Sequence, residues 1–434
     1  MTTQRWAGST SPPRPDVVTL AVAGACVLLV GLDRGVYLTL SAATVVGALL
    51  APVWLSKLSR FPGARLVVAL ALLSAASGVV LMWFAVDDHH TSDRLAAATL
   101  MALANLVVGT GLLLWARTVM PAPAVGALFG VGMLGGALSS GRFDENVWRF
   151  GFSVPVTITA LALAWAWGRR WLEITLTLVL GVASALAGGR STFAMLVLAA
   201  AFTAWQAISP RSRAGSRARV VVVAAVLVFG IYQVGQGLIL DGYLGESAQE
   251  RSQVQIAATG NILLGSRPEM GATAALFLER PWGFGAGTLA GVADVGVAKQ
   301  GMATLGYDPD NGYVERYMFG QGFVLHSVLG DTWAAFGLAG IALVVAVIWW
   351  SVGSLVTLVQ ARVASALVLF LGVRLLWNAF FSPLYSSTPL IALTLGLLLQ
   401  ERAGSGTAPP AYRRRSAPEP VAAPGTPTEA PASS

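Results

Sequence analysis

The chain has 434 residues, of which 55% are hydrophobic and only 11% are charged, and its formal net charge is +7. An ordinary soluble domain is about 25% charged, so this composition excludes a water-soluble globular protein and indicates one embedded in a lipid bilayer. The positive charge is not spread evenly but lies between apolar runs, which makes it a signal of membrane topology, and we expect no nucleic-acid partner.

Apolar runs of about 16 to 24 residues recur along the chain, and a helix of that length crosses the roughly 30 Å of hydrocarbon in a bilayer. The first run continues through a short turn into the second, so we expect it to remain in the protein as a span and not to be cleaved as a signal peptide. The runs predict an all-α polytopic membrane protein with about 12 transmembrane helices, at residues 17–32, 36–55, 66–86, 95–116, 122–140, 153–168, 171–188, 192–208, 220–240, 332–352, 363–381 and 387–400.

The basic residues between the runs predict how the chain is oriented. With the N-terminus inside, the cytoplasmic segments contain 17 basic residues and the short outer loops contain five. Because cytoplasmic segments are enriched in Lys and Arg, we expect a multi-pass protein of the bacterial cytoplasmic membrane with both termini in the cytoplasm. The expected layout is a cytoplasmic tail at 1–16, nine spans at 17–240, a large outer loop at 241–331, three spans at 332–400 and a disordered cytoplasmic tail at 401–434.

The 241–331 loop is the long polar segment of the chain, with five basic and ten acidic residues and therefore a net charge of −5. Connections beyond about 12–15 residues are uncommon unless they have a function, so this length indicates a working surface. Met270–Arg280 predicts a helix that ends at Pro281, and the glycine-rich stretch 283–287 predicts a tight turn against the membrane surface. A nucleotide-binding loop is excluded there, because no strand precedes the glycines and no P-loop lysine follows them.

Three arginines on the outer side are candidate ligands for phosphate, whose geometry the planar guanidinium matches. Arg190 lies at the boundary of the eighth span, where its alternative role is to reach lipid headgroups and anchor two helices. Arg267 precedes the predicted loop helix, and its alternative role is a solvated charge paired with Glu269. Arg374 lies in the outer half of the eleventh span, where an ionisable residue is costly and indicates a functional site unless it extends to the surface or pairs with a loop carboxylate.

His326, the only histidine of the loop, lies just before the tenth span. A free imidazole titrates at about pH 6.5, so a neutral histidine at this boundary can accept a proton from a hydroxyl group, the alternative being a histidine that only packs. His89 and His90 lie side by side in another outer loop, but neighbouring histidines lack a convincing metal-ligand spacing. We therefore predict no metal site and no cofactor.

In order and spacing, these motifs resemble those of the O-antigen ligase and O-antigen polymerase family, over roughly residues 170 to 350. The entrance to the eighth span, residues 189–191 (Gly-Arg-Ser), is similar to the family's Ser-Arg-Gly, and Arg267 followed by residues 281–287 (Pro-Trp-Gly-Phe-Gly-Ala-Gly) is similar to the family's loop helix and Pro-x-x-Gly-x-Gly turn. The family's His-Asn pair is matched by His326 with a serine after it, and residues 336–340 resemble the Gly-Leu-x-Gly opening of the next span.

The resemblance implies a GT-C-like glycosyltransferase that moves a glycan from a polyprenyl-diphosphate donor to an acceptor hydroxyl outside the cytoplasm, without a metal ion and with inversion at the anomeric carbon. Arg190, Arg267 and Arg374 would bind the donor diphosphate through charge-assisted hydrogen bonds, and His326 would deprotonate the acceptor. The expected partners are this donor, a glycan or lipid acceptor, and membrane lipids.

Other classes of protein remain open at this point. A transporter or flippase of lipid-linked sugars would also have twelve spans and an intramembrane arginine, although we see no pair of broken helices in two matching halves. A scaffold of envelope assembly is a third possibility. Ligase and polymerase share the donor and differ in the acceptor, and the sequence does not separate them.

Overall fold

The computed structural model describes residues 15–139, 146–208, 216–240, 249–250, 252–254, 256, 260 and 265–402. Within these ranges the chain is almost entirely helical, and its sheet is a two-stranded antiparallel one made of β1 (Gly35–Tyr37) and β2 (Leu40–Ser41). The predicted tails lie almost wholly outside the described residues, and so does most of the loop from 241 to 264.

Among the described residues, six helical stretches are long and apolar enough to cross a membrane. These are α4 (Ala64–Ala85), α5 (Asp93–Val119), η2 (Val147–Phe152) continuing into α7 (Ser153–Trp167), α9 (Arg190–Ile208), α10 (Arg217–Leu240) and α15 (Val328–Gln360). Further helices in the same bundle are α1 (Val17–Leu32), α6 (Ala122–Leu138), α8 (Arg170–Leu186), α16 (Ala366–Phe381) and α17 (Leu384–Leu398). The predicted all-α membrane protein is confirmed at this level.

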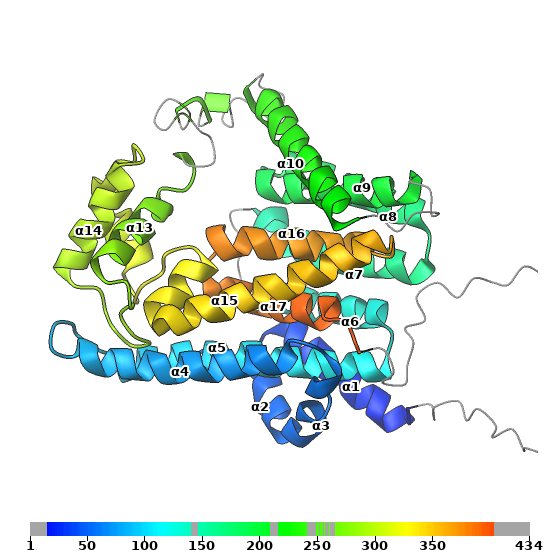
Figure 1. Ribbon diagram of the computed structural model, residues 1–434, viewed down its shortest axis with the longest axis horizontal. Coiled ribbons are helices and arrows are strands. Elements are labelled where there is room, and N and C mark those ends of the chain that lie inside the picture. Colours follow the sequence, from blue (N-terminus) through cyan, green and yellow to red (C-terminus); the bar gives the residue numbers. More distant parts are fainter. Residues whose placement is uncertain are drawn as a thin grey trace, which may run out of the picture.

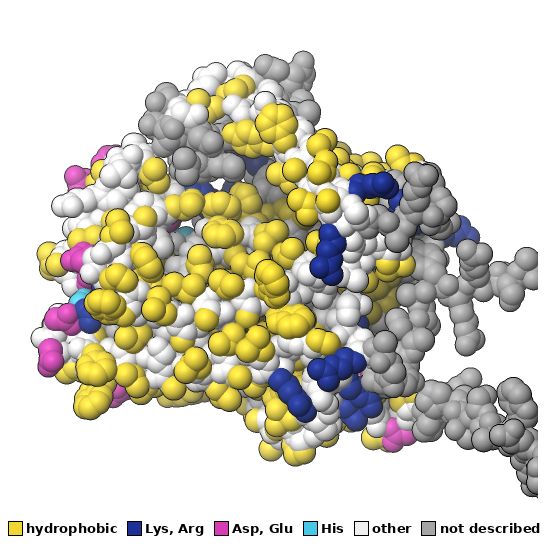
Figure 2. Space-filling view, in the orientation of Figure 1, with side chains coloured by type: hydrophobic (Ala, Val, Ile, Leu, Met, Phe, Trp, Pro, Cys, Tyr) yellow, Lys and Arg dark blue, Asp and Glu magenta, His cyan; other side chains and the backbone are white. Residues whose placement is uncertain are grey.

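Most of these helices lie side by side along the horizontal direction of Figure 1, and α10 crosses them obliquely at the top. The two loop helices, α13 (Glu269–Glu279) and α14 (Val292–Ala303), lie at one end of the bundle, beside the connection between α4 and α5. Both ends of the described chain lie at the opposite end. On the face shown in Figure 2, acidic side chains gather at the loop end and Lys and Arg gather at the end of the termini.

Arginines at the end of the termini bind backbone carbonyls. Arg117 donates to the carbonyls of residues 396, 397 and 399 at the C-terminus of α17, and Arg170 donates to those of residues 362 and 364 between α15 and α16. The buried carboxylate of Glu173 accepts the N–H of Ala366 at 2.6 Å. These groups satisfy carbonyls and an N–H that helix termini leave without partners.

The second predicted span, residues 36–55, differs from the prediction. It forms the two strands and two short helices, α2 (Ala42–Leu49) and α3 (Ala51–Leu55), with a bend of 74° between them. Pro52 lies in the first turn of α3, and a proline there cannot continue α2 because it lacks an N–H and its ring clashes with the preceding turn. The indole of Trp54 donates to the carbonyl of Gly47 at 2.8 Å, which satisfies an acceptor at the end of α2.

The glycine-rich turn at 283–287 is present, but it is wedged between two helices and does not lie on a surface. The N–H groups of Phe284 and Gly285 donate to the carbonyl of Ala334 in α15 at 2.8 and 3.0 Å, and that of Ala286 donates to the carbonyl of Gly78 in α4 at 3.0 Å. Gly285 has φ +111, and a Cβ atom there would lie 2.3 Å from the backbone nitrogen of Met82. Only glycine fits this position, because other residues would be strained and would collide with backbone.

The turn at 283–287 packs against α15 close to a break in that helix. The break is at Gly337, which has φ 63 and ψ −147. The break leaves carbonyls of α15 without donors from the same helix, and residues outside α15 donate to them instead. The N–H groups of the turn donate to the carbonyl of Ala334, and the hydroxyl of Ser77 in α4 donates to the carbonyl of Phe336 at 2.9 Å. The loop has its own hydrophobic core, to which α13, α14 and the first turns of α15 contribute: Ala272, Leu276, Phe284, Ala298, Met302, Val314, Met318, Phe319, Leu325, Trp333 and Ala334. The loop is therefore a folded unit fixed onto the bundle.

Candidate functional site

Arg267 lies two residues before α13 and reaches across to α16. Its guanidinium carbon is 5.4 Å from the ring centre of Trp377 and 5.7 Å from that of Phe381. These rings lie three and seven residues after Arg374, so all three side chains lie along one face of α16. The Nε of Arg267 is buried and has no hydrogen-bond partner among the described residues. The structure thus brings Arg267 to the face of α16 that carries Arg374.

Glu269 does not pair with Arg267, contrary to the alternative considered from the sequence. Its Oε1 accepts a hydrogen bond from the hydroxyl of Tyr313 at 2.7 Å, and within the described ranges its buried Oε2 has no partner. Burial, followed by the charge of the Glu269 carboxylate, raises the pKa of Tyr313 far above its ordinary value. Tyr313 therefore remains a protonated donor, and Glu269 is used in positioning this tyrosine.

The position of His326 is fixed by a hydrogen bond of its ring and by an unusual backbone conformation. Its Nδ1 lies 3.1 Å from the carbonyl of Val324, and since a carbonyl only accepts, Nδ1 carries the proton and Nε2 is the acceptor nitrogen in the neutral ring. The residue has φ +55, a conformation that is strained for a non-glycine residue. Such a conformation persists only where neighbouring contacts enforce it, so those contacts identify the residues that position His326.

Asp331 supplies those contacts. One carboxylate oxygen accepts the N–H of Leu325, the residue before His326, at 2.6 Å, and the other accepts the N–H of Leu384 at the start of α17 at 2.7 Å. Ser327 caps α15 by accepting the N–H of Gly330 at 2.8 Å. The imidazole centre lies 5.9 Å from the ring centre of Tyr313, which connects His326 to the Glu269 hydrogen bond.

Arg374 is half-buried in α16, where its guanidinium lies over the ring of Phe370 at 5.9 Å. Its Nε has no partner in the described part of the chain, and the side chain lies near Asn378 and Thr394. Ion pairs of the described residues include those of Arg60, Arg170, Arg280 and Lys299, but neither Arg267 nor Arg374 pairs with a carboxylate there.

Arg190 is the first residue of α9, a helix that packs against α16. Its Nη1 donates to the hydroxyl of Ser252 at 2.8 Å. Arg267 thus contacts the helix that carries Arg374, and α9, which begins at Arg190, packs on that same helix. Tyr313 connects His326 to Glu269, which lies two residues after Arg267 in the chain. A guanidinium without a carboxylate partner, such as that of Arg267, is suited to an anion, and a neutral imidazole is suited to accept a proton.

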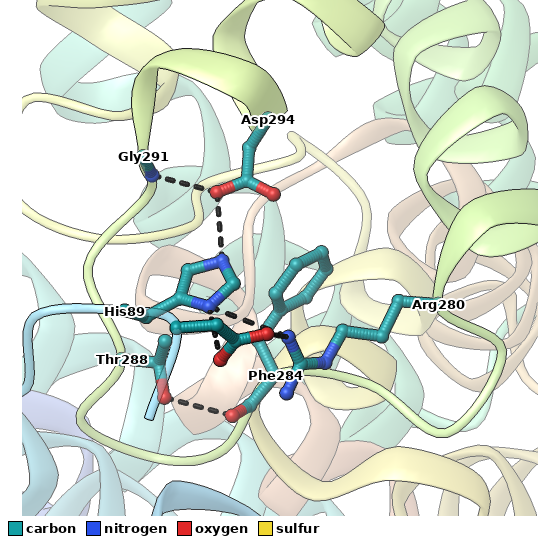
Figure 3. A network of polar contacts seen from close by, with 7 residues as sticks. His89, Arg280, Phe284, Thr288, Gly291 and Asp294 are labelled. Atoms are coloured by element: carbon teal, nitrogen blue, oxygen red, sulfur yellow. Dashed lines mark hydrogen bonds and ion pairs between the residues drawn. The ribbon is translucent and has the colours of Figure 1, made fainter. Parts of the chain in front are cut away.

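A second polar network fixes the other end of α13 (Figure 3). Arg280, the residue that follows α13, donates to Asp88 Oδ2 at 2.7 Å, and Asp88 Oδ1 contacts His89 Nδ1 at 2.7 Å. His89 Nε2 lies 2.9 Å from Asp294 Oδ2, which also accepts the N–H of Gly291 at 2.6 Å. Hydrogen bonds from His89 and then from Arg280 hold the pKa of Asp88 below its ordinary value. The network joins the connection between α4 and α5 to the loop.

The same network bears on the metal alternative considered for His89 and His90. Both ring nitrogens of His89 already face carboxylate oxygens of the network, Nδ1 that of Asp88 and Nε2 that of Asp294. Within the ranges that the structure describes, no group of three or more His, Cys, Asp or Glu side chains is arranged to hold a metal ion. His89 is thus a structural residue of the loop anchor.

No protein-family model, curated protein or solved structure matches the chain. The fold and the composition define an all-α, membrane-embedded protein with a folded polar loop.

Sequence reasoning did not identify Tyr313, Asp331, Asp88 or Asp294 as parts of these sites. Asp331 had one usable signal, since a carboxylate at the start of an apolar span requires hydrogen-bond partners. Tyr313 and Asp294 had none, because their partners lie far away along the chain: 44 residues separate Tyr313 from Glu269, and 205 separate His89 from Asp294. Asp88 adjoins His89, but its ion pair with Arg280 spans 192 residues.

Proposed function

We propose that the chain is a glycosyltransferase that moves a glycan from a polyprenyl-diphosphate donor to an acceptor hydroxyl on the outer side of the bacterial cytoplasmic membrane, as O-antigen ligases and polymerases do. The observation that carries the proposal is Arg267. It is a half-buried cation packed against a pair of aromatic rings, it has no carboxylate partner in the described chain, and it contacts the helix face that also carries Arg374. Such a cation favours a strong anion, and a diphosphate at the membrane boundary supplies one.

The reaction proposed is a direct displacement. The acceptor oxygen bonds to the anomeric carbon while the bond from that carbon to the diphosphate oxygen breaks, and the electron pair leaves with the polyprenyl diphosphate. Nε2 of His326 takes the hydroxyl proton, and Arg267, Arg374 and Arg190 stabilise the charge that develops on the leaving group. Attack from the side opposite the leaving group inverts the anomeric carbon. Three guanidinium groups supply the positive charge, so the proposed reaction uses no metal ion.

The proposal includes the finer topology of twelve spans with both termini in the cytoplasm. It is supported by the position of the two described chain ends at one end of the bundle, where Lys and Arg gather on the visible face. The acidic loop at the opposite end then faces outward, as the excess of cytoplasmic basic residues requires.

A transporter of lipid-linked sugars is the second candidate, because α15 is broken at Gly337 and broken helices often form the binding sites of transporters. The break in this chain is already filled: the carbonyls of Ala334 and Phe336 accept hydrogen bonds from the wedged turn and from Ser77. We therefore favour the transferase. Movement of the donor across vesicles without formation of a glycosidic bond would favour the transporter.

The proposal is tested with lipid-linked glycan isolated from cells that lack the protein, presented to purified full-length chain in lipid nanodiscs. We expect transfer to the acceptor fraction, and His326→Ala lowers the rate at least about 10²-fold, the usual contribution of a general base. The matched control is His90→Ala, which removes a histidine of another outer loop and leaves the rate unchanged. Product formed by His326→Ala at the wild-type rate would remove the histidine from the mechanism, and absence of transfer by the wild-type chain would remove the function.

The same cells distinguish the two kinds of transferase. Single repeat units accumulating on the lipid carrier indicate a polymerase, whereas completed long chains on the carrier indicate a ligase.

A further inference from the structure

Three tyrosines of the loop form a ladder of rings that leads to His326. They belong to the segment that contains η3 (Pro309–Asn311) and η4 (Val314–Met318). The ring centres of Tyr307 and Tyr313 are 6.1 Å apart, those of Tyr313 and Tyr317 are 5.6 Å apart with an angle of 31° between the rings, and Tyr313 lies 5.9 Å from the imidazole of His326. The outer tyrosine, Tyr317, is 68% exposed.

The ladder lies in a polar setting and not in an apolar one. Asp308, Asp310 and Arg316 are exposed in the same segment, and the side chain of Asp310 is 80% exposed. Charged groups are costly inside the hydrocarbon of a bilayer, so this arrangement places Tyr317 outside the hydrocarbon. An exposed aromatic ring surrounded by hydrogen-bonding groups provides a flat apolar face with a polar edge.

The segment is held in one conformation. Lys299 of α14 pairs with Asp310 at 3.1 Å and with Glu315 at 2.6 Å, and so fixes both η3 and η4. The side-chain amide of Asn311 donates to the hydroxyl of Tyr307 at 2.8 Å, and its Oδ1 accepts the N–H of Tyr313 at 3.0 Å. A fixed platform loses little conformational entropy when it binds a ligand.

We propose that the ladder of Tyr307, Tyr313 and Tyr317 is a binding subsite for the neutral saccharide that ends in the acceptor hydroxyl. A sugar ring combines an apolar face of C–H groups with a rim of hydroxyls, so its face packs on Tyr317 while exposed groups such as the Asp308 carboxylate accept from its hydroxyls. The ladder ends at His326, so the saccharide extends from the water toward the proton-accepting nitrogen. This assignment rests on the proposed function and identifies where that reaction takes its acceptor.

The test measures saccharide binding without any donor, by saturation-transfer NMR on the full-length chain in nanodiscs. The probes are short neutral gluco-, manno-, galacto- and arabino-oligosaccharides. We expect at least one of them to receive saturation, the signal to fall about fivefold in Tyr317→Ala, and Tyr317→Phe to stay within about twofold of the wild type, because the aromatic face makes the contact. The control Tyr37→Ala removes another tyrosine, one that is 63% exposed in β1, and leaves the signal unchanged.

The position of the ladder is measured separately with a nitroxide label. The chain has one cysteine, the buried Cys26, so Tyr317→Cys in a Cys26→Ser background carries a single label. We expect the label to collide more with a water-soluble nickel complex than with oxygen dissolved in the lipid. A label that favours oxygen would overturn the proposal in favour of a lipid contact.

Two other results would overturn it: saturation of none of the probes, or equal saturation of the wild type and Tyr317→Ala. Failure of the proposed function looks different. Binding that depends on Tyr317, in a chain that transfers nothing from the lipid-linked donor, would keep the saccharide subsite and remove the transferase.

Discussion

The two ends of α13 each carry an arginine, and the two arginines differ in how their charge is balanced. Arg280, after the helix, pairs with Asp88 at 2.7 Å and belongs to a network with His89. Arg267, before the helix, packs against the paired rings of Trp377 and Phe381 and has no carboxylate partner in the part of the chain that the structure describes.

The difference shows which end of the helix is built for a ligand. A partly buried charge that already has its counter-ion contributes to the fold, whereas one packed on aromatic rings without a counter-ion favours a bound anion. Because one rigid helix joins them, the Arg280 end fixes the position of Arg267 relative to the bundle. The following substitutions separate these roles, from the largest expected effect to the smallest.

Arg267→Ala has the largest expected effect. It removes a donor to the leaving diphosphate, so we expect the transfer rate to fall by about 10²–10³-fold, as for loss of one oxyanion-stabilising group. Thermal unfolding changes much less than the rate, because the variant loses the contacts with the rings of Trp377 and Phe381 but no ion pair with a described residue. The rate is measured with lipid-linked donor in nanodiscs, and Arg316→Ala, an exposed arginine of the same loop, serves as control. A large loss of stability with an unchanged rate would reverse the two roles assigned to the ends of α13.

Arg280→Gln is expected to lower the stability of the loop and to change the transfer rate much less. It breaks the ion pair with Asp88 and leaves the network with His89 incomplete, so we expect the loop to lose about 1–3 kcal/mol of stability, the usual contribution of hydrogen bonds to charged groups. Hydrogen exchange of the α13 amides measures this directly. Transfer falls much less than in Arg267→Ala once the assay is run at a temperature where the loop is folded. Unaltered exchange in α13 would show that the network does not anchor the helix.

Acidification has the smallest expected effect, and the effect is on stability. The pKa of Asp88 is lower in the folded protein than in the unfolded chain, so its contribution to stability is present above the unfolded value of about 3.9 and is lost as the pH falls through the lowered folded value. The Asp88 side chain is 56% exposed, which limits the contribution to less than about 1 kcal/mol. We expect exchange in the α4–α5 connection to accelerate at acidic pH, and Asp88→Asn to remove that dependence. An identical pH profile in the variant would assign the effect to another group.

Local features of the fold could be predicted from the sequence where neighbouring residues decide the structure. The loop helix expected at Met270–Arg280 is α13, Glu269–Glu279, since its alanines and leucines favour a helix and Pro281 ends it. The tight turn after it was predicted from its glycines, but its insertion between α4 and α15 was not. The insertion depends on contacts with Gly78 and Ala334, which are distant in the chain.

In the candidate site, too, the residues could be predicted from the sequence but their distant contacts could not. Arg374 could be predicted because an ionisable residue in an apolar span is costly without a use, His326 because an imidazole can accept a proton, and Arg267 because it combines with the motifs around it. Their surroundings could not be predicted: Glu269 was considered as the partner of Arg267, but it accepts from Tyr313. The positive φ of His326 follows from tertiary contacts around Asp331, which a local pattern does not contain.

The wedged turn at 283–287 also dictates an order of biogenesis. Its acceptor in α4 is synthesised long before it, but its acceptor in α15, Ala334, emerges from the ribosome only later, and Leu384, which binds Asp331, later still. The turn can therefore make its second contact only after α15 has been synthesised, and Asp331 can reach Leu384 only after the start of α17. A chain that stops before Leu384 retains every proposed site residue but lacks the hydrogen bond that ties Asp331 to the final helix.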